Sequence, residues 1–198
     1  MLRITAAVVA ASLCAAAFAQ APQVRIRGNV EKLDGNMLTV KSRTGETMPV
    51  KLADNVVVMG IHKASVNDIQ NGKFVGTTTV GERNGALVAL EVHIFPENMR
   101  GTGEGHRDWD LRPQSKMTNA NVAQIKSVGS DREMTVQYKG GEQKVLVTPQ
   151  TQVVSYAPAS KADLKPGAAV FVVATKADDG SLSAPRVNVG MNGQMPPM

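Results

Sequence analysis

An internal repeat constrains the fold of this chain more than any other feature: residues 28–94 return as residues 120–189. From Val50 onward the two copies differ by a constant 95 positions, so that Ala64-Ser65 returns as Ala159-Ser160. An ungapped match of this length is specific evidence for duplication. Each unit has about 70 residues, which is close to the lower limit for a domain that folds alone.

Short segments of alternating apolar and polar residues fill both units, for example residues 38–42 and 145–147. Turn dipeptides such as Asn84-Gly85 separate these segments, and this combination indicates antiparallel strands. Ser65 and Ser160 each begin a Ser-x-x-Asp sequence, which is typical of a capping box at the start of a helical turn. We therefore predict an all-β fold of two tandem small antiparallel β-barrels, OB-like or SH3-like, each with one short helical turn.

The first residues have the features of a secretory signal. Arg3 precedes an apolar stretch at 4–18, and Ala17-Phe18-Ala19 is a typical cleavage site, so we expect a periplasmic or secreted protein. Cys14, the only cysteine, lies in this segment, which excludes disulfides and thiolate sites from the mature chain. No later apolar stretch is long enough for a transmembrane helix.

The predicted order along the chain therefore has five segments. They are a signal peptide at 1–19, a first barrel at 23–95, a glycine-rich connector at 96–119, a second barrel at 120–190 and a tail with Met and Pro at 191–198.

Charge and motifs exclude several classes of function. The formal net charge is +5, but the basic residues are scattered and no stripe of cations alternates with aromatics, so we expect no nucleic-acid partner. The common sequence motifs of hydrolases, metalloproteases and P-loop proteins are absent. These absences favour a protein without enzymatic activity.

The connector holds the candidate metal ligands. In an extended chain Glu104, His106, Asp108 and Asp110 point to one side, where carboxylates and an imidazole suit a divalent cation. The alternative is a plain connector whose charges are solvated. Three methionines in the tail offer thioethers for Cu(I), or simply end the chain. No other cofactor is expected.

Two further expectations concern single side chains. Trp109, the only tryptophan, stands between two acidic residues, and we expect its indole to pack in the crevice between the barrels as an interface residue. His93 shares a strand face with Glu91, which we expect to face solvent as a surface pair; the alternative is a catalytic dyad. A hydrolase or isomerase with His93 or His106 as its base is a further alternative.

Residues 95–111 read Phe-Pro-Glu-Asn-Met-Arg-Gly-Thr-Gly-Glu-Gly-His-Arg-Asp-Trp-Asp-Leu. This run resembles the central signature of an uncharacterised family of exported bacterial proteins with a β-barrel repeat of unknown function. The pieces Asp-Leu-x-x-Gly-x-x-Val at 163–170 and Gly-x-Leu-x-Ala at 180–184 are similar to that repeat. The resemblance implies export and a barrel fold, and the family carries no established activity.

These observations together favour an exported, non-enzymatic binding or scaffolding protein of the cell envelope. Its partner would be an envelope protein or a small ligand. The alternative is a periplasmic metal-handling or transporter-accessory protein that uses Glu104, His106, Asp108 and Asp110.

Overall fold

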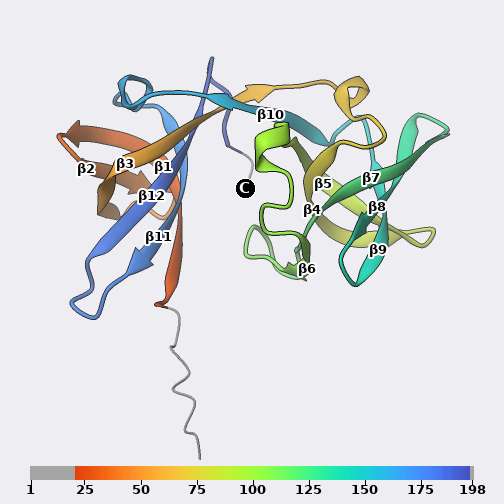
Figure 1. Ribbon diagram of the computed structural model, residues 1–198, viewed down its shortest axis with the longest axis horizontal. Helices are drawn as coiled ribbons and strands as arrows, with labels where there is room; N and C mark the ends of the chain where they lie inside the picture. Colours follow the sequence, from red (N-terminus) through yellow and green to blue (C-terminus); the bar gives the residue numbers. More distant parts are fainter. Residues whose placement is uncertain (1–20, 197–198) are drawn as a thin grey trace, which may run out of the picture.

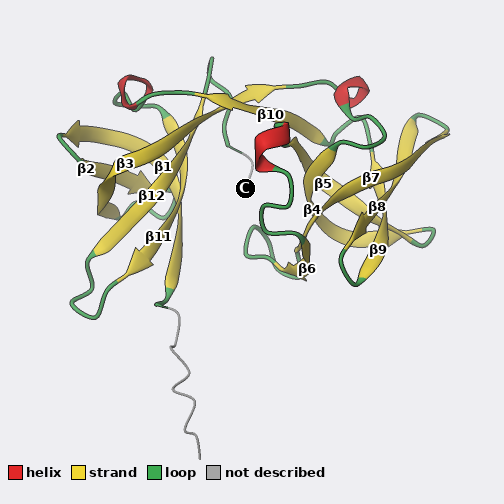
Figure 2. Ribbon diagram, in the orientation of Figure 1, coloured by secondary structure: helices red, strands yellow, loops and turns green. Residues whose placement is uncertain are grey.

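Strands make up most of the computed structural model, which describes residues 21–196 (Figure 1). They are β1 (Gln23–Asp34), β2 (Met37–Ser42), β3 (Thr47–Lys63), β4 (Phe74–Arg83), β5 (Ala86–Ile94), β6 (Gly105–Asp108), β7 (Lys116–Val128), β8 (Asp131–Tyr138), β9 (Gly141–Val147), β10 (Gln152–Pro158), β11 (Ala169–Lys176) and β12 (Leu182–Gly190). Three 3-10 turns accompany them, η1 (Val66–Asp68), η2 (Glu97–Met99) and η3 (Lys161–Asp163) (Figure 2). The prediction of an all-β fold is confirmed.

Two of the expectations fall outside these residues. The signal peptide at 1–19 lies beyond the described part of the chain, as does Met198 of the tail. Within residues 21–196, the structure contains no helix with the length and hydropathy needed to span a bilayer.

Five strands form a closed barrel, which we call the first barrel. β1 pairs antiparallel with β2 and β11, β2 with β3, and β11 with β12. A parallel pairing between β12 and β3, centred on Val187 and Val58, completes the circle. Alternate side chains of these strands, among them Ile26, Val40 and Val172, fill the interior. Closure leaves this sheet without a free edge.

A second ring of pairings joins the other main strands. β4 pairs with β5 and β7, β7 with β8, and β8 with β9, all antiparallel. β5 then pairs in parallel with β9 and with β10. Val75, Val92 and Val136 belong to its separate buried core. We call this set the second ring.

The strands do not follow the expected order along the chain. The first barrel takes β1 to β3 from the first half of the sequence and β11 and β12 from the end, while the second ring takes its strands from residues 74–158. The expectation of two consecutive barrels is therefore not confirmed. Two connections carry the chain across, the first after β3 and the second after β10, and Figure 1 shows both strands running between the two bodies.

The pairing of β3 with β10 is symmetric about its centre. Ile61 lies opposite Tyr156, Met59 opposite Pro158, and Lys63 opposite Val154. Ile61 and Tyr156 are also 95 positions apart, so the predicted repeat aligns each with the residue that it faces. The two halves of the molecule are thus related about a local twofold axis at this pair.

The expected helical turns stand at these crossings. In η1 the Ser65 hydroxyl accepts a hydrogen bond from Asn67 N at 3.1 Å, and Asp68 accepts one from Ser65 N at 2.7 Å. Before η3, Ser160 N donates to Asp163 at 2.9 Å. Both Ser-x-x-Asp sequences therefore form the capping contacts that they predict.

Candidate functional site

A pocket of about 460 Å³ lies between the first barrel and the second ring, and we call it the central pocket. Outward-facing residues of both bodies line it, together with β10 and the connector. Its apolar and aromatic walls are Val57, Phe95, Met99, Trp109, Met117, Tyr156, Val173 and Pro185. Sites for small molecules usually have this size and are largely apolar with a few polar groups.

One wall is a row of residues across three strands of the second ring. Gly76 of β4 pairs with His93 of β5 on one side and with Asn119 of β7 on the other. A Cβ on Gly76 would stand 1.8 Å from His93 Nε2 and 2.7 Å from Asn119 Oδ1. The missing side chain of Gly76 therefore leaves the room in which the imidazole and the amide lie.

The first barrel presents the facing wall. Asn188 of β12 pairs with Phe171 of β11, and it lines the pocket beside Val173. His93 and Asn188 are 95 positions apart, so the predicted repeat aligns them. The same strand position of the two bodies thus contributes a buried polar side chain to one shared pocket.

Four lining residues have buried polar atoms without a hydrogen-bond partner in the described structure. The unpaired atoms are the two ring nitrogens of His93, the indole Nε1 of Trp109, and the amide oxygens Oδ1 of Asn119 and Asn188. Leaving a buried polar group unpaired costs about 1–3 kcal/mol, so such groups are rare in protein cores. Their concentration around one pocket sets it apart from the rest of the described structure, where Thr79 Oγ1 is the other buried side-chain atom left unpaired.

Burial fixes the charge state of the histidine. The His93 side chain is 1% exposed, and desolvation lowers its pKa to about 3, with a further contribution from Arg107. The imidazole is therefore neutral at neutral pH, with one nitrogen that donates and one that accepts. Its ring lies 5.3 Å from that of Phe95, which in turn stacks on Tyr156 at 5.1 Å.

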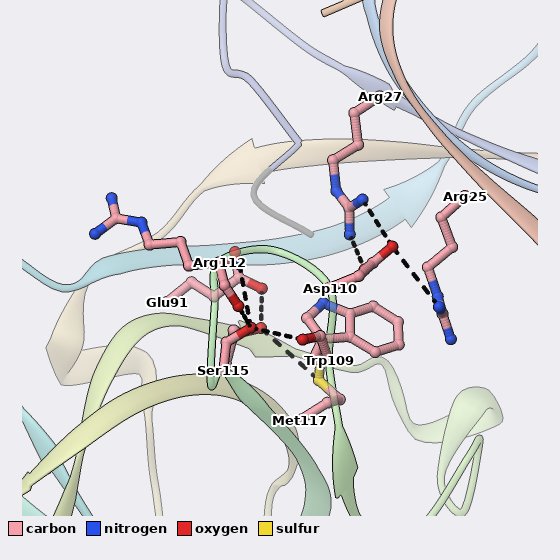
Figure 3. A network of polar contacts seen from close by, with 9 residues as sticks. Arg25, Arg27, Glu91, Trp109, Asp110, Arg112, Ser115 and Met117 are labelled. Atoms are coloured by element: carbon pink, nitrogen blue, oxygen red, sulfur yellow. Dashed lines mark hydrogen bonds and ion pairs between the residues drawn. The ribbon is translucent and has the colours of Figure 1, made fainter. Parts of the chain in front are cut away.

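The connector reaches across to the first barrel at Trp109 and Asp110. The Arg25 guanidinium lies 4.2 Å from the centre of the Trp109 ring. Asp110 accepts a 2.7 Å hydrogen bond from Arg27 and lies 3.7 Å from Arg25, and Figure 3 shows both guanidinium groups beside its carboxylate. These two arginines belong to β1, so the contacts join the connector to the first barrel.

The four candidate metal ligands do not come together. Glu104 accepts a hydrogen bond from Lys139 N, His106 pairs with the Thr118 hydroxyl, and Asp108 forms an ion pair with Lys116. Asp110 is held by the β1 arginines. Within residues 21–196, no three such groups are close enough to hold a metal ion. The metal hypothesis assumed that side chains alternate between two faces along an extended segment from Glu104 to Asp110. The strand β6 ends at Asp108, so this alternation does not reach Asp110.

Glu91 and His93 do share a strand face, but the expectation that this face meets solvent is wrong. Glu91 is 2% exposed, because the first barrel and the connector cover this side of β5. Burial raises the pKa of Glu91 to about 7, partly offset by a 2.7 Å hydrogen bond from the Thr78 hydroxyl and by Arg27 and Arg43. The two side chains are not hydrogen-bonded to each other, since the Glu91 carboxyl bonds Thr78 and neither ring nitrogen of His93 has a partner among the described residues.

Sequence reasoning placed Trp109 between the two bodies and named His93 as a candidate base, but it missed Asn119 and Asn188 and did not bring these residues to one pocket. The signal was present, since His93 and Asn188 both interrupt apolar strands: Val92 and Ile94 flank the first, Val187 and Val189 the second. Asn119 offered no such signal, because its partner Gly76 is recognised only from the strand pairing.

No protein-family model matches the sequence, and comparisons with curated proteins and with solved structures find no significant match. Membership of the exported bacterial family therefore stays a prediction.

Proposed function

We propose that the protein is an exported, non-enzymatic binding protein that holds a small organic molecule in the central pocket. The observation that carries this proposal is the set of unpaired buried polar atoms on His93, Trp109, Asn119 and Asn188 around a pocket with large apolar and aromatic walls. Such a set suits a ligand that offers hydrogen bonds on more than one side and an apolar body between them.

We also propose that the first barrel and the second ring are two copies of the same small barrel, OB-like or SH3-like, and that they arose by duplication. Equivalent irregularities support this view: β1 has a bulge between Val30 and Lys32, and β7 has one between Val122 and Gln124. The pocket between two such bodies then follows from their symmetric assembly.

Binding is tested with N-phenyl-1-naphthylamine, an uncharged aromatic dye that fluoresces when it leaves water. Val57 lines the pocket and is 46% exposed, so Val57→Phe narrows the entrance without disturbing a core. Val128 is 48% exposed and lies outside the pocket lining, so Val128→Phe is a matched control. We expect saturable binding that the first variant weakens and the second does not. Absence of saturable binding, or equal binding by both variants, would contradict the proposal.

A further inference from the structure

The charged residues of the central pocket are all of one sign. Arg107 and Arg186 line it, and none of its described lining residues is an aspartate or a glutamate. Arg107 is half-buried and Arg186 is exposed. Arg107 lies on β6, which pairs with β7 of the second ring, and Arg186 lies on β12 of the first barrel. A small site lined by cations alone attracts anions.

Arg107 has contacts that hold it in place but none that balances its charge. Its Nη1 donates to Gly103 O at 2.7 Å, and its guanidinium lies 5.7 Å from the centre of the Trp109 ring. Burial and the nearby Arg25 lower the pKa of Arg107, as expected for a cation without a counter-ion. Among the described residues, neither Arg107 nor Arg186 forms an ion pair.

The contrast with the arginines of β1 is informative. Arg25 and Arg27 have Asp110 as a shared carboxylate partner at the edge of the same region. The chain thus supplies an acid for these two cations and none for the two that line the pocket. Arginine presents a planar group of donors that matches a carboxylate or sulfonate in a two-point contact.

We propose that the central pocket selects organic acids, with an aromatic or apolar body between Phe95, Trp109 and Val173 and an acid group held by Arg107 and Arg186. This inference rests on the proposed function.

The test compares two dyes of one skeleton, 5-anilinonaphthalene-1-sulfonate and the uncharged N-phenyl-1-naphthylamine. Both carry the same rings and the same N–H, so the difference in affinity reports the acid group. A charge-assisted hydrogen bond contributes enough that we expect the sulfonate to bind about tenfold more tightly. We expect Arg107→Gln and Arg186→Gln each to remove most of this preference, which is measured as the ratio of the two affinities for each variant.

Arg112→Gln is the control, because Arg112 is an exposed arginine of the connector outside the pocket lining. Arg186 is exposed as well, so its variant is expected to fold even where Arg107→Gln unfolds the connector. If both dyes bind equally, or if Arg112→Gln lowers the preference as much as Arg186→Gln, the selection of acids is overturned while the proposed function stands. If neither dye binds, both fail.

Discussion

The imidazole of His93 lies directly over Gly76, with Nε2 1.8 Å from the point that a Cβ on this glycine would occupy. A methyl group at Gly76 therefore forces His93 out of its place between β4 and the Phe95 ring. We expect Gly76→Ala to lower the free energy of unfolding by about 2 kcal/mol, as overpacking of a core does. Urea denaturation measures this loss.

Gly141→Ala is a suitable control for that variant. Gly141 is exposed, and the nearest atom to a Cβ there is the Tyr138 hydroxyl at 3.1 Å, the far end of a side chain. A loss at Gly141 as large as that at Gly76 would show that the close approach of His93 is not the cause.

The buried Glu91 makes a contribution to stability that is lost as the pH rises from about 4.5 to about 7. His93, whose pKa is lowered to about 3, contributes in the opposite direction up to its ordinary pKa of 6.5, so the contribution of Glu91 is measured as a difference from a variant. In the unfolded chain this carboxyl ionises at its ordinary pKa of 4.5, while in the folded protein it stays protonated up to about 7. Over this interval the folded state binds more protons, so deprotonation favours unfolding, by about 3 kcal/mol in all.

The measurement is urea denaturation at pH 5 and pH 8. Glu91→Gln keeps the uncharged form at every pH and leaves His93 unchanged, so we expect the native protein to lose stability relative to this variant between pH 5 and pH 8. Glu82→Gln, an exposed position on the same hairpin, is expected to behave like the native protein. If the native protein and Glu91→Gln change in stability by the same amount between pH 5 and pH 8, the assignment of Glu91 is refuted.

The polar lining of the central pocket predicts a conflict between stability and binding. The Asn188 side chain is 9% exposed with an unpaired Oδ1. Asn188→Leu removes that desolvated oxygen, so we expect a gain of about 1 kcal/mol in the free energy of unfolding and weaker dye binding. Asn121→Leu is the control: Asn121 Oδ1 accepts from Arg100, so its loss is expected to destabilise. A lower stability of Asn188→Leu would argue that the amide is structural.

The fluorescence of Trp109 is expected to report the contact between the connector and the first barrel. The indole is half-buried against Arg25, with its Nε1 shielded from solvent, so we expect emission blue-shifted from that of tryptophan in water. Trp109→Ala is expected to cost about 2 kcal/mol, less than for a fully buried aromatic, and to leave the strand content unchanged by circular dichroism. Red-shifted, readily quenched emission would place the indole in water.

The exchange of strands predicts how fragments behave. Residues 21–98 contain β1 to β5 and therefore three strands of the first barrel with two of the second ring, but neither set complete. We expect this fragment, and residues 115–196, to lack a cooperative monomeric transition alone and to gain one when mixed. Analytical ultracentrifugation and thermal unfolding decide this. A monomeric fragment that unfolds cooperatively would contradict the observed pairing.

Local features of this fold were predictable from the sequence because their causes are local. Alternation indicated strands such as β2 and β8, and the Ser-x-x-Asp pattern placed the turns after Ser65 and Ser160. Which strands close a barrel was not predictable in this way. A duplicated chain offers β3 two equivalent partners, β12 or β5, and the sequence pattern of the two is nearly the same.

The candidate site illustrates the same limit. The metal hypothesis for Glu104, His106, Asp108 and Asp110 assumed one continuous extended segment, whereas β6 stops at Asp108. The burial of Glu91 and His93 depends on what covers β5, which the pattern of one strand does not reveal. The pocket exists only because outer faces from opposite ends of the chain meet.

The exchange of strands also determines when, during synthesis of the chain, the first barrel can close. β1, β2 and β3 are made early, but residues 64–168 must follow before β11 and β12 exist to close the barrel around them. Until then both outer strands of that early sheet keep unpaired backbone groups, which invite association with other chains. A nascent chain therefore cannot form the first barrel as observed until β12 has been made, and a product that ends before β12 leaves β3 without its parallel partner.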